Sequence, residues 1–81
     1  QVYSFGSGEA ELVRVELPTL LAGHRVNELT VVGDIHVIAI ERDNKTLLPT
    51  TGTVFQKGDV VYIAATSASG GQLRKLLGKT M

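Results

Sequence analysis

The sequence contains no cysteine and no tryptophan, and neither sign of charge is in excess. Without cysteine the chain can form no disulfide framework, no thiolate zinc site and no cysteine nucleophile, and the reducing cytosol is its simplest location. Eight basic residues balance eight acidic ones, so the formal net charge is zero. This balance argues against a protein that binds the phosphate backbone of a nucleic acid, because such a protein needs a basic face to displace counterions.

Long apolar segments are also missing. The longest wholly apolar run covers residues 60–65, far below the roughly 20 residues that span a bilayer. The start of the chain has no basic segment followed by an apolar one, so we expect no signal peptide. The sequence therefore predicts a domain that does not insert into a membrane and that lies in the cytoplasm.

The 81 residues, 43% of them hydrophobic, are enough for one small domain. A single core of this size gives only about 3–5 kcal/mol of net stability, which favours a protein that also buries surface against a partner. We assign residues 1–9 to an extended N-terminal linker that ends in a glycine-rich turn, residues 10–79 to the domain, and residues 80–81 to a tail.

Alternation of apolar and polar residues predicts the strands of this domain. The expected strands cover residues 10–17, 35–41, 46–48 and 60–66. Val26 and Leu29, three positions apart, indicate a single helical turn after the first strand. Leucines at i, i+3 and i+4 after residue 72 predict a C-terminal helix. The fold class is therefore α+β: a small, mostly antiparallel sheet of about four strands, joined mainly by hairpins, with a short helical turn and a C-terminal helix.

The second expected strand is the clearest, and both of its faces are mostly apolar. Strict alternation puts Ile35, Val37 and Ala39 on one face. His36, Ile38 and Ile40 fall on the other. A strand that is apolar on both faces is typical of the interior of a sheet.

Two short motifs suggest nucleotide chemistry and fail on their spacing. Gly78-Lys79-Thr80 matches the end of a phosphate-binding loop, but Leu73 stands where that loop needs a glycine, and the triplet follows a helix instead of preceding one. Gly6-Ser7-Gly8 has Glu11 at the third glycine position of a dinucleotide fingerprint, and no strand precedes it. We predict no nucleotide site from either motif.

Other candidate groups are incomplete. His24 and His36, with Asp34 beside the latter, supply too few ligands for a metal site unless folding adds Glu28 or Asp43, and we predict none. Lys45 at a hairpin tip raises the biotinyl or lipoyl carrier class as a remote alternative. The residues around it lack the small or methionine neighbours of the carrier lysine. No convergent acid, base or nucleophile is visible, so we predict no enzyme.

An ordered series of weak motifs carries a resemblance. Residues 21–29 read LAGHRVNEL, residues 37–42 read VIAIER, a proline follows at position 49, and residues 58–63 read GDVVYI. Together these motifs resemble the C-terminal domain of the Trk-system potassium uptake regulator, also called the C-terminal domain of regulators of potassium conductance. Two positions depart from the pattern, since His24 replaces a common lysine and Ala65 replaces a common glycine.

The resemblance implies a non-enzymatic regulatory domain that forms a homodimer. In that family a preceding Rossmann-like domain, absent from this chain, binds nucleotides, and the assembly controls a membrane potassium channel or transporter from the cytoplasmic face. Similar domains occur in cation/proton antiporters and other transporters. A purely structural dimerisation module is the alternative to an effector-binding one.

The resemblance also implies an effector in some members, where cyclic di-AMP binds at the dimer interface. We expect no other cofactor in this domain. The polar residues expected at such a pocket are Arg25, Asn27, His36 and Arg42, since arginines can contact phosphates and Asn or His can read a base edge. For an apolar dimer seam the candidates are Leu12, Ile38 and Ile40.

Overall fold

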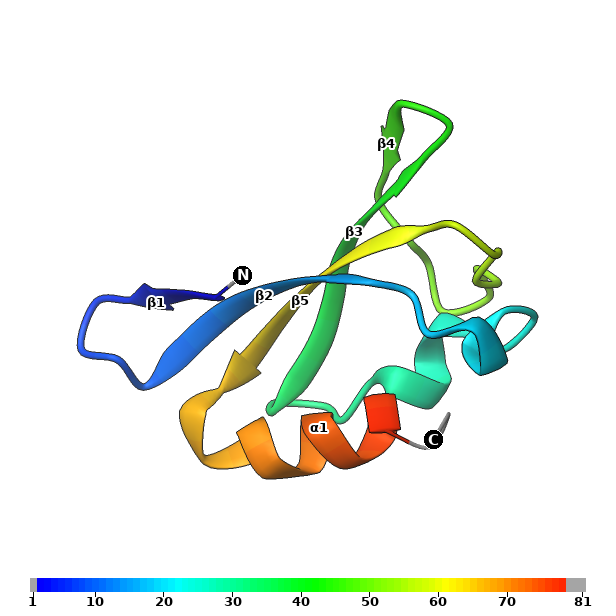
Figure 1. Ribbon diagram of the computed structural model, residues 1–81. Helices are drawn as coiled ribbons and strands as arrows, with labels where there is room; N and C mark the ends of the chain where they lie inside the picture. Colours follow the sequence, from blue (N-terminus) through cyan, green and yellow to red (C-terminus); the bar gives the residue numbers. More distant parts are fainter. Residues whose placement is uncertain (1, 79–81) are drawn as a thin grey trace.

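The computed structural model describes residues 2–78, which form one antiparallel sheet with a helix packed on it (Figure 1). The order of the strands in the sheet is β1-β2-β5-β3-β4, and each neighbouring pair is antiparallel. The strands are β1 (Val2–Phe5), β2 (Ala10–Glu16), β3 (Ile35–Arg42), β4 (Lys45–Leu47) and β5 (Val60–Thr66). The helix α1 covers Gly70–Gly78. The predicted α+β class, with its antiparallel sheet and C-terminal helix, is confirmed.

The N-terminal segment, predicted to be a linker, contains an additional strand. β1 pairs with β2, with Val2 opposite Val13 and Phe5 opposite Ala10. Gly6 and Gly8 have φ angles of +45° and +85°, so they reverse the chain between the two strands with backbone conformations that glycine adopts readily. A short edge strand next to a glycine-rich turn carries little alternation, which explains why the pattern missed it.

Among residues 2–78, two of the connections between strands are hairpins, which is fewer than we predicted. β1–β2 and β3–β4 are adjacent in sequence and in the sheet, whereas β5 lies between β2 and β3. The β3–β4 hairpin, expected around Lys45, turns at Asp43 and Asn44, whose φ angles of 52° and 64° are the left-handed pair that a two-residue hairpin turn requires. The long connection from β4 leads back across the sheet, so the last strand becomes its centre.

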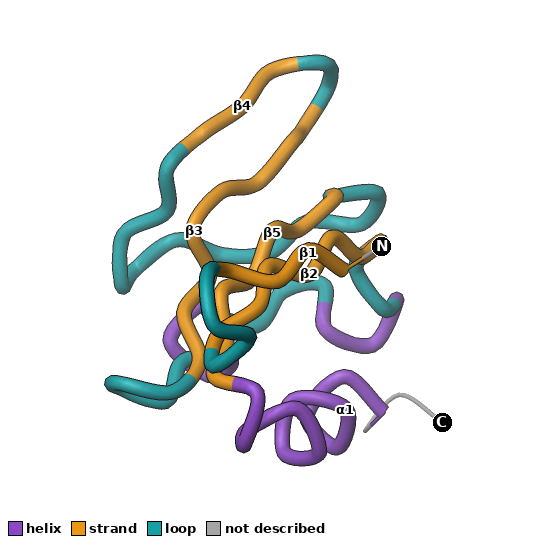
Figure 2. Tube along the Cα trace, turned by 90° about the vertical axis from the view of Figure 1, so that its left-hand side faces the viewer, coloured by secondary structure: helices purple, strands orange, loops and turns teal. Residues whose placement is uncertain are grey.

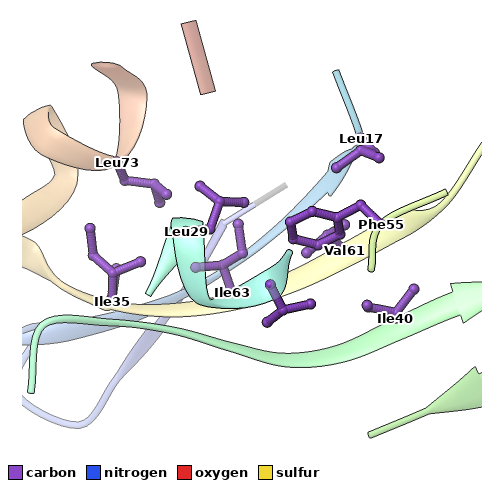
Figure 3. Close-up of a cluster of buried hydrophobic side chains, with 10 residues drawn as sticks. Leu17, Leu29, Ile35, Ile40, Phe55, Val61, Ile63 and Leu73 are labelled. Atoms are coloured by element: carbon purple, nitrogen blue, oxygen red, sulfur yellow. The ribbon is translucent and has the colours of Figure 1, made fainter. Parts of the chain in front are cut away.

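One face of the sheet holds the core. The helix α1 and the 3-10 helices η1 (Thr19–Leu21) and η2 (Val26–Leu29) lie on this side of the strands (Figures 1 and 2). The single turn predicted at 26–29 is confirmed, with Val26 and Leu29 buried. Figure 3 shows the apolar side chains that meet between helix and strands. The buried apolar residues are Leu17, Val26, Leu29, Ile35, Ile40, Phe55, Val61, Ile63, Ala65 and Leu73.

The faces of β3 differ from the predicted alternation because the strand contains a bulge. Val37 lies opposite Ile63, but Ala39 already lies opposite Tyr62, which leaves Ile38 as an extra residue. The extra residue shifts the pattern by one position, so Ile40 joins the core instead of the opposite face. β3 has a neighbour on each side, as expected of an interior strand.

Candidate functional site

A buried ion pair links the end of β3 to the turn before β5. Arg42 Nε donates to Asp59 Oδ1 at 2.9 Å, and Arg42 Nη2 donates to Asp59 Oδ2 at 2.8 Å. The same nitrogen reaches the carbonyl of Val54 at 3.0 Å, and the amide of Gln56 donates to Asp59 Oδ2 at 2.9 Å. The Asp59 side chain is 1% exposed, whereas that of Arg42 is 22% exposed. The two-pronged contact therefore holds the 54–59 loop against the sheet.

The environment of Asp59 keeps it ionised. Burial alone would raise the pKa of this carboxyl group, but the hydrogen bonds from Arg42 and from the Gln56 amide outweigh burial and lower the pKa below its ordinary value. The sequence predicted Arg42 for an effector site and gave Asp59 no role. The sequence signal that could have indicated a buried carboxylate is the position of Asp59 directly before β5, a strand that is apolar on both faces.

Two of the four predicted effector residues meet near this loop. Arg25 forms an isolated antiparallel bridge with Val54, the residue whose carbonyl accepts from Arg42. Asn27 lies in η2, which begins directly after Arg25, and both are exposed. The structure therefore brings Arg25 and Arg42 to the same backbone segment and places Asn27 one turn away.

The fourth predicted residue, His36, is elsewhere. It lies near the start of β3, whereas Arg42 ends it, and six residues of strand span roughly 20 Å. His36 Nε2 accepts a hydrogen bond from the amide of Gly33 at 3.0 Å. A shallow hollow of about 160 Å³ adjoins it, lined by small residues and Asp34. Within a single chain, His36 is not in one site with the two arginines.

The three residues predicted for an apolar dimer seam do not share one surface either. Ile40 is 0% exposed in the core of the single chain, so it offers no surface to a partner. Ile38, pushed out by the bulge, is 41% exposed. Leu12 is half-buried and lies opposite Ala64, on the face of the sheet away from α1. Only Leu12 and Ile38 remain as surface candidates.

The histidines and carboxylates considered for a metal do not converge. His24 Nδ1 lies 3.0 Å from Glu28 Oε1, one helical turn away, while His36 contacts Gly33. Among residues 2–78, no three histidine, aspartate or glutamate side chains are grouped as a metal site would require. In the same part of the chain no helix is long and apolar enough to cross a membrane. The phosphate-loop motif at 78–80 extends beyond the described residues, as does the predicted tail.

Comparison with known families identifies the domain. The model of the TrkA-C domain family matches residues 11–78, which is nearly the whole described chain. The chain belongs to the TrkA-C domain family. TrkA-C domains are regulatory domains of potassium transport systems, so the predicted family and its regulatory class are confirmed, and the carrier alternative based on Lys45 is set aside.

Solved structures share the fold of this TrkA-C domain. A structure described as an RCK domain with cda superposes with a TM-score of 0.65 at 19% identity, covering 82% of this chain and 96% of the other. The GsuK RCK domain gives a TM-score of 0.67 at 23% identity, covering 88% of this chain and 17% of the other. A search of curated proteins gave no match. At these identities the structural matches support the fold alone.

Proposed function

We propose that this TrkA-C domain forms a homodimer that binds a small anionic effector and thereby controls the gating of a membrane potassium channel or transporter. The observation that carries the proposal is the family match over residues 11–78. In the proposed assembly the domain acts on the cytoplasmic face of the membrane, joined to its transport partner through a Rossmann-like domain. It carries out no chemical reaction of its own.

The mechanism is a shift between two arrangements of the dimer. An effector that binds one arrangement more tightly shifts the equilibrium by the difference in its two binding free energies and by nothing else. A coupling of about 1–3 kcal/mol changes the ratio of the two states by roughly 5–150-fold, which is enough to switch a transport system. The domain therefore needs only a modest preference for one arrangement.

Cyclic di-AMP is the effector we propose, and Arg25 is the residue best placed to contact it. One similar structure is described as an RCK domain with cda, which we take to denote a cyclic dinucleotide. Arg25 is exposed beside Val54, and a guanidinium group forms strong two-pronged contacts with phosphate. Arg42 bonds the Val54 carbonyl and Asp59, so it would act chiefly by holding the 54–59 loop in position.

Titration calorimetry with cyclic di-AMP tests the proposal. We expect saturable heat with the wild-type domain and an affinity about tenfold or more weaker for Arg25→Gln, because a charge-assisted hydrogen bond contributes about 1.5–3 kcal/mol. Arg74→Gln is the matched control, since Arg74 is an exposed arginine on α1. If an intact dimer gives no heat at high micromolar ligand, the effector role is wrong.

Two observations favour a second function. The hollow beside His36 is shallow, and the guanidinium group of Arg42 is bonded to Asp59. Both facts favour a module that only dimerises and holds a larger assembly together. In that case the wild-type domain is a dimer in light scattering and cyclic di-AMP leaves its urea midpoint unchanged. A cation/proton antiporter is the alternative transport partner, which a pull-down from membranes with the full-length protein distinguishes.

A further inference from the structure

The face of the sheet opposite α1 carries apolar residues without a helix to cover them. We call this surface the outer face, and it consists of the outward side chains of β2, β3 and β5. Within residues 2–78, helices lie only on the other side of the strands (Figures 1 and 2). Leu12 lies opposite Ala64 in the β2–β5 register, and Ala39 lies opposite Tyr62 in the β3–β5 register. Ile38, expelled by the bulge, is the most exposed large apolar residue of β3.

A charged cluster crosses the middle of the outer face. Arg14 Nε donates to the Tyr62 hydroxyl at 3.1 Å, and the guanidinium carbon lies 5.8 Å from the centre of the tyrosine ring. The same hydroxyl donates to the carboxylate of Glu41. Three adjacent strands therefore supply a cation, a bridging hydroxyl and a carboxylate. The side chain of Tyr62, in the central strand, contacts both of the opposite charges.

The arrangement of these charges fits a second copy of the same surface. In a two-fold dimer each surface meets itself, so a patch must be complementary to its own copy. A patch with a positive and a negative group meets this condition when the two-fold axis lies in the interface and runs along β5 near Tyr62, because this axis places Arg14 of each chain beside Glu41 of the other. A partner with charge of one sign would leave one of these two groups opposed by a like charge.

The domain is large enough for a dimer contact of ordinary size. It measures 33 × 27 × 22 Å, and a stable interface buries roughly 800 Å² on each partner, so the contact would cover the outer face and extend to neighbouring parts of the broad side. Apolar residues around a polar cluster match the composition of such interfaces, in which a few polar contacts fix orientation. The zero net charge of the chain adds no overall repulsion between two copies.

We propose that two copies of this chain associate through their outer faces and that Arg14 and Glu41 set their relative orientation by pairing across the interface. Leu12 and Ile38 supply the apolar contact. This inference rests on the dimerisation in the proposed function and adds the surface and the residues that determine its geometry. Tyr62 acts as a positioning residue, because it orients both charges without supplying one.

Sedimentation of charge-exchange variants tests this geometry. Arg14→Glu leaves two carboxylates facing each other across the interface, and Glu41→Arg leaves two guanidinium groups, so each variant alone should dimerise at least tenfold more weakly than the wild type. A 1:1 mixture restores both opposite-charge pairs, so we expect a heterodimer of near wild-type affinity. Far-UV circular dichroism and urea midpoints establish that each variant is folded.

A second pair of variants tests the apolar part. Leu12→Glu should give a monomer, whereas Leu20→Glu, which changes a leucine 62% exposed in η1, should remain a dimer. A wild-type dimer that none of the outer-face variants weakens would overturn the proposed surface and leave the regulatory function intact. A wild-type domain that stays monomeric at high micromolar concentration would contradict this surface together with the proposed dimerisation. The calorimetric titration would still report effector binding on its own.

Discussion

Removing either partner of the Arg42–Asp59 pair should destabilise the domain, and by unequal amounts. Arg42→Met leaves a carboxylate that is 1% exposed and retains one hydrogen bond, from the Gln56 amide. Removing one partner of a buried pair typically costs about 3–5 kcal/mol, and we expect about 3 kcal/mol here because Arg42 reaches the surface. Asp59→Asn leaves a guanidinium group that is 22% exposed and that water can solvate. We therefore expect only about 2 kcal/mol for this variant, the worth of a charge-assisted hydrogen bond.

Urea denaturation followed by far-UV circular dichroism measures both effects. With a slope of about 1 kcal/mol per molar urea for a small domain, the midpoint should fall by roughly 3 M for Arg42→Met and 2 M for Asp59→Asn. The double variant Arg42→Met/Asp59→Asn should be less destabilised than the sum of the two, because it contains no uncompensated buried charge. If each single variant lost less than about 0.5 kcal/mol of unfolding free energy, and the double variant lost the sum of the two, the pair would not contribute to folding.

The same pair predicts the sign of a pH dependence. The pKa of Asp59 is lower in the folded chain than in the unfolded chain, so the unfolded chain binds more protons in the acid range. The stabilisation is therefore complete above the unfolded pKa, about 3.9, and is lost as the pH falls through the lower folded pKa. The difference in stability between wild type and Asp59→Asn should be constant near neutral pH and shrink below about pH 4. A difference that grows on acidification would contradict this assignment.

Three further predictions concern single elements of the fold. Asn44→Gly should raise the free energy of unfolding by about 0.5–1 kcal/mol in urea melts, because glycine adopts the φ angle of +64° without steric strain. A loss of stability would contradict the turn assignment. Ile63→Val should cost about 1 kcal/mol at a fully buried site, whereas Val32→Ala, at a residue 88% exposed, should change the urea midpoint little. His24→Ala should raise the pKa of Glu28, which the hydrogen bond with His24 now lowers; carboxyl carbon NMR titration measures it, and an unchanged pKa would show that the contact is absent in solution.

Elements dictated by local patterns could be predicted from the sequence. Period-two alternation identified β2, β3 and β5, and Asp43 and Asn44 tolerate the positive φ angles of the turn between β3 and β4. The position of β5 between β2 and β3 could not be predicted, because pairing between distant strands depends on the packing of the whole core. The bulge at Ile38 has no glycine or proline signal, so the alternation of β3 gave Ile40 the wrong face.

The contacts of the candidate site residues could not be predicted from the sequence, for a related reason. Residue type alone favoured Arg42 as a phosphate ligand, but a guanidinium group finds its partner through three-dimensional proximity, and here that partner is Asp59. The outer-face cluster was missed because its members come from three strands. Arg14, Glu41 and Tyr62 become neighbours only through the sheet order, which no local pattern encodes.

The two arginines near Val54 consequently differ in what an anionic effector can gain from them. A phosphate that withdrew Arg42 from Asp59 would leave a buried carboxylate uncompensated, and the cost would offset most of the new contact. Arg25 involves no such loss, because its side chain is exposed. An effector that contacts the Arg42 side chain without displacing Asp59 would instead add negative charge beside the pair and hold the 54–59 loop in place. Effector affinity should therefore depend directly on Arg25, and on Arg42 chiefly through the position of this loop.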